Sequence, residues 1–281
     1  MLLAITSLIW GSSFILIKRG LAVFDPLEVG TLRIFFAFLA FIPILIFNYK
    51  KLPKKLGAWL LLAGLIGSFF PSLLFSLAGS KLQSSVSGML NAITPLFTVL
   101  VGSIFFSQTF ALQKWVGLAV GLVGALILGF VNAKGGLDLN AYVLVVAFAT
   151  LLYAFNVNLL KIKFGHVPPL VLSAATIVSV GPFACILLFG FTDFTHKITE
   201  VPGAWAAAGY ISILGLFGTA LALVLFNKLI QISSPLTASS VTYIMPVVSV
   251  LWGVVDGEPF HLLQLIGLAA ILVGVWMVNK R

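Results

Sequence analysis

The stretch GLAVGLVG at residues 117–124 occurs again as GLAAILVG at residues 267–274, with six of eight residues identical. The two copies lie 150 residues apart in a chain of 281 residues. Each copy is preceded by a proline: Pro95 aligns with Pro246 at an offset of 151. Self-similarity at a fixed period indicates a repeated structural unit. The sequence therefore predicts two copies of one unit, each about half of the chain.

The beginnings of the two units also match, at an offset of 143 residues. LIWGSSFILIKRGLAVFDPL at residues 8–27 aligns with LLYAFNVNLLKIKFGHVPPL at residues 151–170. The pairs in register are Trp10 with Tyr153, Lys18 with Lys161, and Pro26 with Pro169. We expect a first five-helix repeat over residues 1–134 and a second over residues 135–281.

The composition indicates a membrane protein. Hydrophobic residues make up 61% of the chain and charged residues only 8%, whereas roughly a quarter of a soluble domain is charged. The apolar runs are long enough to cross the bilayer as helices, and they lack the two-residue alternation of a β-barrel. We predict an all-α polytopic membrane protein with ten transmembrane helices, at residues 2–19, 28–48, 57–79, 84–106, 112–131, 139–160, 168–191, 203–228, 235–255 and 260–278.

Charged residues between the spans predict the orientation, because cytoplasmic loops of membrane proteins are enriched in Lys and Arg. With a cytoplasmic N-terminus, the inner connections hold ten basic and no acidic residues: Lys50, Lys51, Lys54, Lys55, Lys114, Lys161, Lys163, Lys228, Lys280 and Arg281. The outer connections hold Lys18, Arg19, Lys81, Lys134 and Lys197 with all seven acids: Asp25, Glu28, Asp138, Asp193, Glu200, Asp256 and Glu258. Both termini are therefore expected in the cytoplasm. The first apolar run lacks a basic leader and a cleavage site, so we expect it to be retained.

Five spans in each unit give the second copy the opposite orientation to the first. Inverted-topology repeats are typical of transporters, in which two halves of one fold exchange conformations and open a central site to either face. A membrane anchor has no comparable use for such a duplication. The arrangement therefore favours alternating access by a transporter of small solutes.

Several other classes are disfavoured. The net charge of +9 is spread over short clusters, without the basic stripe of a nucleic-acid binder. The single Cys185 excludes an intramolecular disulfide, and His166, His196 and His261 all lie in connections. We therefore expect no metal, no cofactor and no enzyme activity, since no nucleophile, base and acid gather at one depth.

Five segments resemble the EamA branch of the drug/metabolite transporters: WGSSFILIK, LRIFFAF, TPLFTVLVG, MPVVSVLWG and the ending GEPF…LIGLAAILVGVW. The resemblance covers essentially the whole chain. It implies efflux of amino acids or related metabolites across a membrane, which we expect to be a bacterial inner membrane. One departure is that Glu258 stands in the second copy where the first has Gln108, so a matched pair of acids is not implied.

Polar and aromatic residues at mid-span predict the substrate pathway, because polar groups in hydrocarbon need a partner or a water-filled cavity. Asn91, Thr94, Pro95 and Thr98 share one helix face, and Ser239, Thr242, Pro246 and Ser249 repeat the pattern. The candidates are Trp10, Ser13, Asn91, Thr94, Tyr153, Asn156, Thr242 and Tyr243, with Pro95 and Pro246 as helix-bending prolines. The alternative for each Ser or Thr is close helix packing.

Four charged or small-residue features have two interpretations each. Lys18 and Lys161 are either interfacial anchors or guards of a cavity mouth. Arg33 either reaches Glu28 or Asp25 at the outer surface or contacts substrate, and we favour the surface. The acids Asp256 and Glu258 either form a paired site or lie at a helix N-terminus, where acids are favourable. The glycines Gly117, Gly121 and Gly124 pack span five against span ten or against a second copy in a homodimer.

The predicted lining contains hydroxyls, an amide and aromatic rings without an acid in the hydrocarbon core. Such a lining suits a neutral or zwitterionic metabolite. The rival interpretations are an intramembrane enzyme and a non-transporting scaffold or receptor, which would bind a partner without solute flux.

Overall fold

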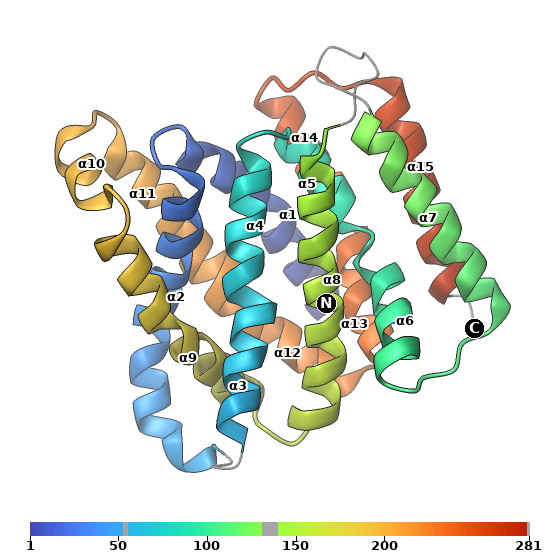
Figure 1. The fold of residues 1–281 in the computed structure, drawn as a ribbon, viewed down its shortest axis with the longest axis horizontal. Helices are drawn as coiled ribbons and strands as arrows, with labels where there is room; N and C mark the ends of the chain where they lie inside the picture. The colour runs from blue at the N-terminus through green and yellow to red at the C-terminus, as the bar shows by residue number, and fades with distance from the viewer. Residues whose placement is uncertain (53–55, 131–139, 280–281) are drawn as a thin grey trace.

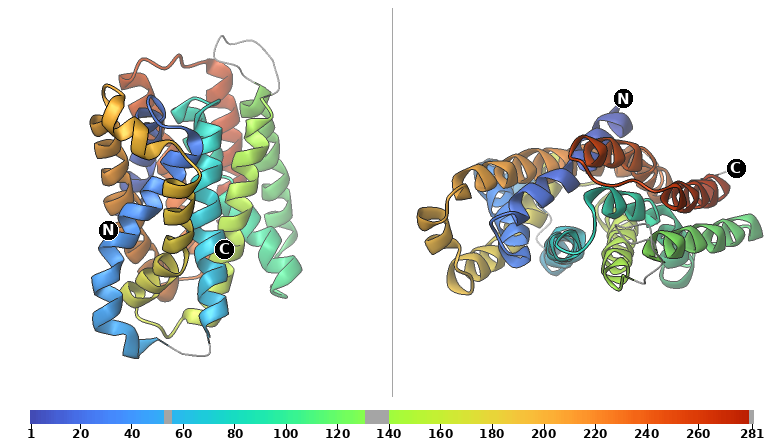
Figure 2. Two further views of the ribbon diagram at one scale, coloured as in Figure 1. Left: turned by 60° about the vertical axis from the view of Figure 1, so that its left-hand side comes forward. Right: turned by 90° about the horizontal axis from the view of Figure 1, so that it is seen from above.

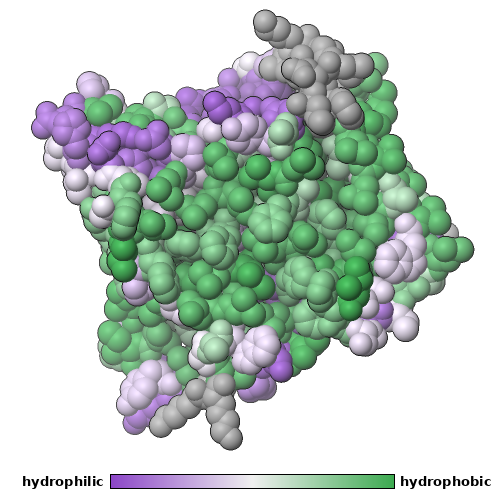
Figure 3. Space-filling model, in the orientation of Figure 1, coloured by the Kyte–Doolittle hydropathy of each residue, from purple (hydrophilic) through white to green (hydrophobic). Residues whose placement is uncertain are grey.

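The computed structural model describes residues 1–52, 56–130 and 140–279. All regular structure in these ranges is helical, and nine helices are long and apolar enough to cross a membrane, with Leu112–Leu128 as a shorter apolar helix. The ten expected spans are therefore all helical. In Figure 3 an apolar band runs across the molecule between two polar ends, as expected of a protein embedded in a bilayer.

Some expectations lie outside the described residues. They are the repeat boundary at 134 and 135 and the charges of Lys54, Lys55, Lys134, Asp138, Lys280 and Arg281. One connection differs from expectation, because residues Phe194–Glu200 form the short helix α10 within what was predicted to be an outer loop.

The first repeat contains α1 (Leu2–Leu21), α2 (Pro26–Asn48), η1 (Tyr49–Lys51), α3 (Gly57–Gly64), η3 (Leu65–Phe69), α4 (Phe70–Gly79), α5 (Ser84–Asn91), α6 (Thr94–Phe105) and α7 (Leu112–Phe130). The second contains α8 (Tyr142–Phe164), α9 (Pro169–Gly190), α10, α11 (Ala204–Ile213), η4 (Leu214–Leu221), α12 (Ala222–Ile232), α13 (Pro235–Ser239), η5 (Ser240–Tyr243), α14 (Met245–Val255) and α15 (Leu262–Asn279). Two of these segments, α2 and α9, begin at the matched prolines Pro26 and Pro169, which suit a first helical turn.

The third and eighth spans each change to a π-helix in the middle. Segment η3 joins α3 to α4, and η4 joins α11 to α12, without a break in the chain of helical residues. A π-helical turn inserts a residue into the α-helical hydrogen-bond pattern and is frequent at functional sites. The two repeats therefore carry the same irregularity in the same helix.

The fourth and ninth spans are interrupted rather than merely bent. Span four divides into α5 and α6, and span nine into α13, η5 and α14. Pro95 and Pro246 are the second residues of α6 and α14, where a missing N–H removes no helical hydrogen bond. Discontinuous helices are common where transporters place their binding sites.

The repeats contact each other along corresponding helices. Helix α7 packs along α15 at one end of the molecule, and α2 packs along α9 (Figures 1 and 2). A β-carbon at Gly117 would lie 2.6 Å from the carbonyl oxygen of Gly274, and one at Gly124 would lie 2.6 Å from that of Gly267. These glycines let two backbones approach closely. The glycine stripe of span five therefore packs on span ten of the same chain, as one of its two interpretations predicted.

Candidate functional site

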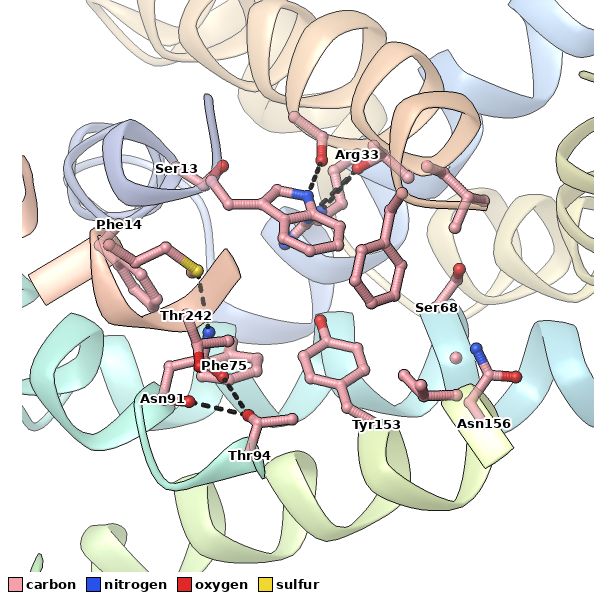
Figure 4. A pocket seen from close by; sticks show the side chains of 18 of the residues that line it. Ser13, Phe14, Arg33, Ser68, Phe75, Asn91, Thr94, Tyr153, Asn156 and Thr242 are labelled. Atoms are coloured by element: carbon pink, nitrogen blue, oxygen red, sulfur yellow. Dashed lines mark hydrogen bonds between the residues drawn. The ribbon is translucent and has the colours of Figure 1, made fainter. Parts of the chain in front are cut away.

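A cavity of about 70 Å³ lies between the central helices of both repeats, several times the space that one water molecule needs. Figure 4 shows its wall. Seven of the eight residues that the sequence suggested for the pathway line it: Trp10, Ser13, Asn91, Thr94, Tyr153, Asn156 and Thr242. Tyr243 is not among the lining residues; its hydroxyl donates to the carbonyl of Val275 on α15 at 3.2 Å. Pro95 and Pro246 shape the helix interruptions beside the cavity without lining it.

The first helix of each repeat contacts the π-helical segment of the other. A β-carbon at Gly218 in η4 would lie 2.9 Å from Ser13 Oγ on α1, and one at Gly67 in η3 would collide with the amide of Asn156 on α8. Ser13 and Asn156 differ by the 143-residue offset, and Gly67 and Gly218 by the 151-residue offset. The two contacts are therefore related by the inverted repeat, and each requires a residue without a side chain.

Trp10 joins the two repeats by a polar and an aromatic contact. Its indole Nε1 donates to the carbonyl of Gly218 in the π-helical segment η4 at 2.8 Å. Its ring lies 4.8 Å from that of Phe226, between centroids. On the opposite wall the ring of Tyr153 stacks on Phe75 at 5.8 Å. Two aromatic pairs thus line the cavity, and each pair contains one ring from each repeat.

The interruption of span four presents polar groups to the cavity. Thr94 Oγ1 donates to the carbonyl of Asn91 at 2.7 Å and lies 3.3 Å from Asn91 Oδ1. The amide nitrogen of Asn91 in turn donates to the sulfur of Met245 at 3.6 Å. Thr242 Oγ1 bonds to the carbonyl of Ser239 at 2.9 Å in the corresponding part of span nine. The interruptions of both repeats therefore meet at the cavity.

Arg33 does not reach the outer surface, as the sequence interpretation favoured. Its side chain lines the cavity and is 8% exposed. Nε and Nη2 each donate to Thr219 Oγ1 at 3.1 Å. The acids expected to pair with it are taken by Lys197, whose Nζ lies 2.6 Å from Asp25 and 2.8 Å from Glu28. The surface interpretation was wrong because α10, which the sequence did not predict, brings a competing lysine.

Asn156 places an unpaired polar atom at the wall of the cavity. It is 5% exposed, and its Oδ1 is buried with no hydrogen-bond partner in the described chain. An amide oxygen without a partner costs free energy in an apolar environment. The position is therefore suited to a solute that supplies a donor.

Ion pairs join the two repeats at the end of the molecule that the charge distribution predicts to face outward; we call this the outer end and the opposite one the inner end. Lys18 Nζ lies 2.5 Å from Asp256 and 2.9 Å from Glu258, and Arg19 also bonds to Asp256. Glu258 accepts from the backbone N–H groups of Ser84 at 2.9 Å and Ser85 at 3.1 Å. Glu258 therefore does lie at a helix N-terminus, but that of α5 in the other repeat. Burial favours its neutral form, yet the hydrogen bonds from Lys18, Ser85 and Ser84 lower the pKa of Glu258 to about 2.

Lys197 on α10 strengthens the same end of the molecule. Burial opposes its charge, but its hydrogen bonds to Asp25 and Glu28 raise the pKa of its ammonium group. Lys18 also lines a small second cavity that shares Phe14, Ile17 and Phe75 with the central one. The lysine therefore lies between the central cavity and the outer surface.

The inner end is held by uncharged partners. Lys161 Nζ donates to the carbonyls of Ile230, Gln231 and Ser233, at 3.1, 3.2 and 2.7 Å. These carbonyls belong to the last turn of α12 and the residue that follows it, where a cation is favourable. Gln108, at the position corresponding to Glu258, donates to Asn158 Oδ1 at 3.0 Å. The Gln108–Asn158 bond therefore joins the two repeats at this end, whereas Lys161 and its partners all belong to the second repeat.

Sequence reasoning missed the π-helical lining residues Gly67, Ser68, Gly218 and Thr219. The signal was present, because the Gly-Ser dipeptide at 67–68 recurs as Gly-Thr at 218–219 with the offset of the prolines. Sequence reasoning also underestimated the importance of Arg33 for the cavity. Arg33 is the one basic residue of the sequence that was assigned to no connection between spans, and charges inside spans mark solute pathways.

The chain is similar to known transporters over its whole length. The model of the EamA-like transporter family matches residues 1–130 and 140–280. The uncharacterized inner membrane transporter YedA of Escherichia coli (strain K12) is 28% identical over 280 residues, which cover 97% of this chain and 87% of that protein. A probable amino-acid metabolite efflux pump of Salmonella typhimurium (strain LT2) is 24% identical over 277 residues, covering 96% and 90%.

The fold is also found in a solved structure. A protein of known crystal structure superposes with a TM-score of 0.70, covering 99% of this chain and 95% of that one at 18% identity. Such a likeness establishes the helical arrangement.

Proposed function

Because the chain belongs to the EamA-like transporter family, and is therefore an integral membrane transporter, we propose that it exports small organic metabolites, amino acids among them, by alternating access. The relative named as a probable amino-acid metabolite efflux pump supports this substrate class and direction. The relative named as an inner membrane transporter supports a bacterial inner membrane, and the excess of basic residues in the connections predicted to be inner supports both termini in the cytoplasm.

The observation that carries the proposal is the central cavity shared by two inverted repeats. Matched residues of the two repeats, Trp10 with Tyr153 and Ser13 with Asn156, face it from opposite sides. Such a site stays in place while the halves rock around it and expose it to either face.

The contacts at the two ends suggest what must change during transport. Opening to the outside separates Lys18 from Asp256 and Glu258, which lie in different repeats. Opening to the inside separates the corresponding neutral contact between Gln108 and Asn158. One set of contacts forms while the other breaks, so neither conformation leaves a path through the membrane.

The test is efflux from proteoliposomes that contain the purified protein. Vesicles are loaded with a mixed metabolite extract, and mass spectrometry follows which solutes leave faster than from protein-free vesicles. We expect selective loss of one chemical class, reduced in Trp10→Ala and Asn91→Ala. Trp205→Ala serves as the control, because Trp205 is 75% exposed at the beginning of α11 and does not line the cavity.

Two results would speak against the proposal. If no solute leaves selectively, with or without an imposed proton gradient, the chain is better described as a scaffold or receptor. If a new compound appears in the vesicles instead, the cavity is the active site of an intramembrane enzyme.

A further inference from the structure

Arg33 is a buried cation for which the described chain supplies no acidic partner. Its guanidinium lines the central cavity, and its only hydrogen-bond acceptor there is the hydroxyl of Thr219. The guanidinium remains charged in proteins, and a charge inside a membrane needs a counterion or water. From this we propose that the transported solute carries a carboxylate, and that Arg33 binds it. The inference rests on the proposed function, because it names the chemistry of the solute in the same cavity.

Four of the six described acids form ion pairs elsewhere. Asp25 and Glu28 pair with Lys197, and Asp256 and Glu258 pair with Lys18. The remaining described acids, Asp193 and Glu200, are exposed at the ends of α10. The counterion of Arg33 must therefore come from outside the described protein.

The guanidinium has the donors that a carboxylate needs. An arginine side chain has five N–H groups, of which two point to Thr219. The other three make no hydrogen bond within the described residues. A planar fork of N–H groups matches the two oxygens of a carboxylate, which is why arginine is preferred at such sites.

The fold itself does not require a charge at this position. Thr176 is the residue of α9 that corresponds to Arg33 at the 143-residue offset. Its hydroxyl bonds to the carbonyls of Leu172 and Ser173, both at 3.0 Å, within its own helix. The second repeat therefore builds the same helix with a neutral residue that does not line the cavity. Arg33 is thus better explained by a ligand than by packing.

The surroundings favour a monocarboxylate over a phosphate. Arg33 is the only cationic residue among those that line the cavity in the described chain, and Trp10, Phe75, Tyr153 and Phe226 supply apolar ring faces. A dianion would leave one charge uncompensated in this setting, whereas a carboxylate balances the guanidinium. Asn156 Oδ1, buried without a partner, can accept from an amino or hydroxyl group of the same solute. An α-amino acid or a hydroxy acid has both groups.

The test is equilibrium binding to the detergent-purified protein, measured by calorimetry without any need for flux. The probes are the twenty standard amino acids with acetate, lactate and benzoate, each paired with its primary amide. The amide keeps the shape and loses the charge. We expect at least one carboxylate to bind about 10- to 150-fold more tightly than its amide, because this is the factor in affinity that a hydrogen bond to a charged group contributes.

The variants assign that preference to one side chain. Arg33→Gln is expected to abolish the preference for carboxylate over amide, and Arg33→Lys to retain part of it, since the charge remains and the fork is lost. Lys163→Gln removes one positive charge at an exposed position and is expected to leave the preference intact. Elution as a single peak in size-exclusion chromatography, together with a retained melting transition, shows that each variant is folded.

The inference is overturned if no carboxylate in the panel binds more tightly than its amide, or if folded Arg33→Gln keeps the preference. Both results leave selective efflux, and with it the proposed function, untouched. Conversely, Arg33-dependent binding of a carboxylate without efflux supports a carboxylate site at Arg33 and contradicts transport of the bound solute.

Discussion

The second helix of the first repeat carries Arg33 where the second helix of the second repeat carries Thr176, and the loop before α15 carries Glu258 where the loop before α7 carries Gln108. Elsewhere the two repeats are alike around the cavity, in their π-helical segments and in their interrupted fourth helices. Backbone features are thus shared, while at each of these two pairs of positions one copy is charged and the other is neutral. This difference indicates that the inverted repeat supplies the mechanism of opening and that the charged residues supply selectivity and a bias between the two ends.

The largest effect is expected where the charge in the cavity is removed. Arg33→Gln should lower the rate of carboxylate efflux from proteoliposomes by about 10- to 150-fold, the worth of a charged hydrogen bond. Thr176→Val should change it by about twofold or less, because the Thr176 hydroxyl bonds only within its own helix and the change is confined to one buried hydroxyl. Equal losses of efflux rate in both variants would mean that Arg33 and Thr176 contribute equally and that the charge of Arg33 does not determine the rate.

The second prediction concerns the contact between α7 and α15, whose sequences are the most alike of the two repeats. In Gly274→Ala the new β-carbon would collide with the carbonyl of Gly117 and approach the backbone nitrogen of Gly121 to 2.6 Å. Backbone atoms cannot move aside cheaply, so we expect the free energy of unfolding to fall by about 1–3 kcal/mol. Unfolding in SDS followed by circular dichroism measures this.

The matched control for that variant is Gly190→Ala, whose β-carbon would meet no atom within 4 Å. It should unfold at the same SDS concentration as the unmodified chain. If Gly274→Ala also unfolds at the SDS concentration of the unmodified chain, the close approach of α7 and α15 does not stabilise the contact between these two helices.

The outer end should depend on pH in a way that the inner end does not. At neutral pH Glu258→Gln should destabilise the chain by about 1 kcal/mol, at the low end for a charged hydrogen bond because Lys18 is partly exposed. The folded-state pKa of Glu258 is lowered to about 2 from an ordinary value of 4.5. Its contribution is therefore complete above about pH 4.5 and is lost as the pH falls toward 2.

The measurement is the melting temperature of both chains between pH 3 and pH 7. The difference in melting temperature between the unmodified chain and Glu258→Gln should be constant at neutral pH and shrink below pH 4.5. Other groups titrate in both chains, so their effects cancel in this difference. A difference that grows on acidification would show that Glu258 is held in its neutral form instead.

The smallest effect is expected at the inner end. Lys161→Gln removes a cation from the last turn of α12, where such a charge is worth about 0.3–1 kcal/mol. Since its partners are carbonyls, the loss should be the same at pH 3 and pH 7. A pH-dependent loss measured by the same melting experiment would mean that Lys161 pairs with an acid.

The sequence was sufficient for the membrane-spanning helices and for seven of the residues that line the cavity. Apolar length and the repeat offset place the spans, and the mid-span polar residues Trp10, Asn91 and Tyr153 do line one cavity. This succeeds because a polar group in hydrocarbon has few alternatives to a cavity. Tyr243, next to Thr242 in the sequence, points instead toward α15, since adjacent helical residues face different directions.

What the sequence could not give depends on pairing between distant segments. Arg33 lies seven residues beyond Pro26, close enough to Glu28 for a surface pair in one helix, and only the position of Lys197 on α10 shows that this acid is already engaged. In the same way Glu258 was recognised as a capping acid, but the helix it caps lies in the other repeat. Local patterns predict the type of contact and leave the partner open.

The most direct test of alternating access at the shared cavity is the reactivity of one cavity residue from both sides of the membrane. In a Cys185→Ser background, Ser13→Cys is exposed to a membrane-impermeant maleimide in right-side-out and in inside-out vesicles. Ser80→Cys, at an exposed site between α4 and α5, should react in right-side-out vesicles alone and thus reports orientation. We predict that Ser13→Cys reacts in both preparations, and reaction from one side alone would contradict a site that opens alternately to the two faces.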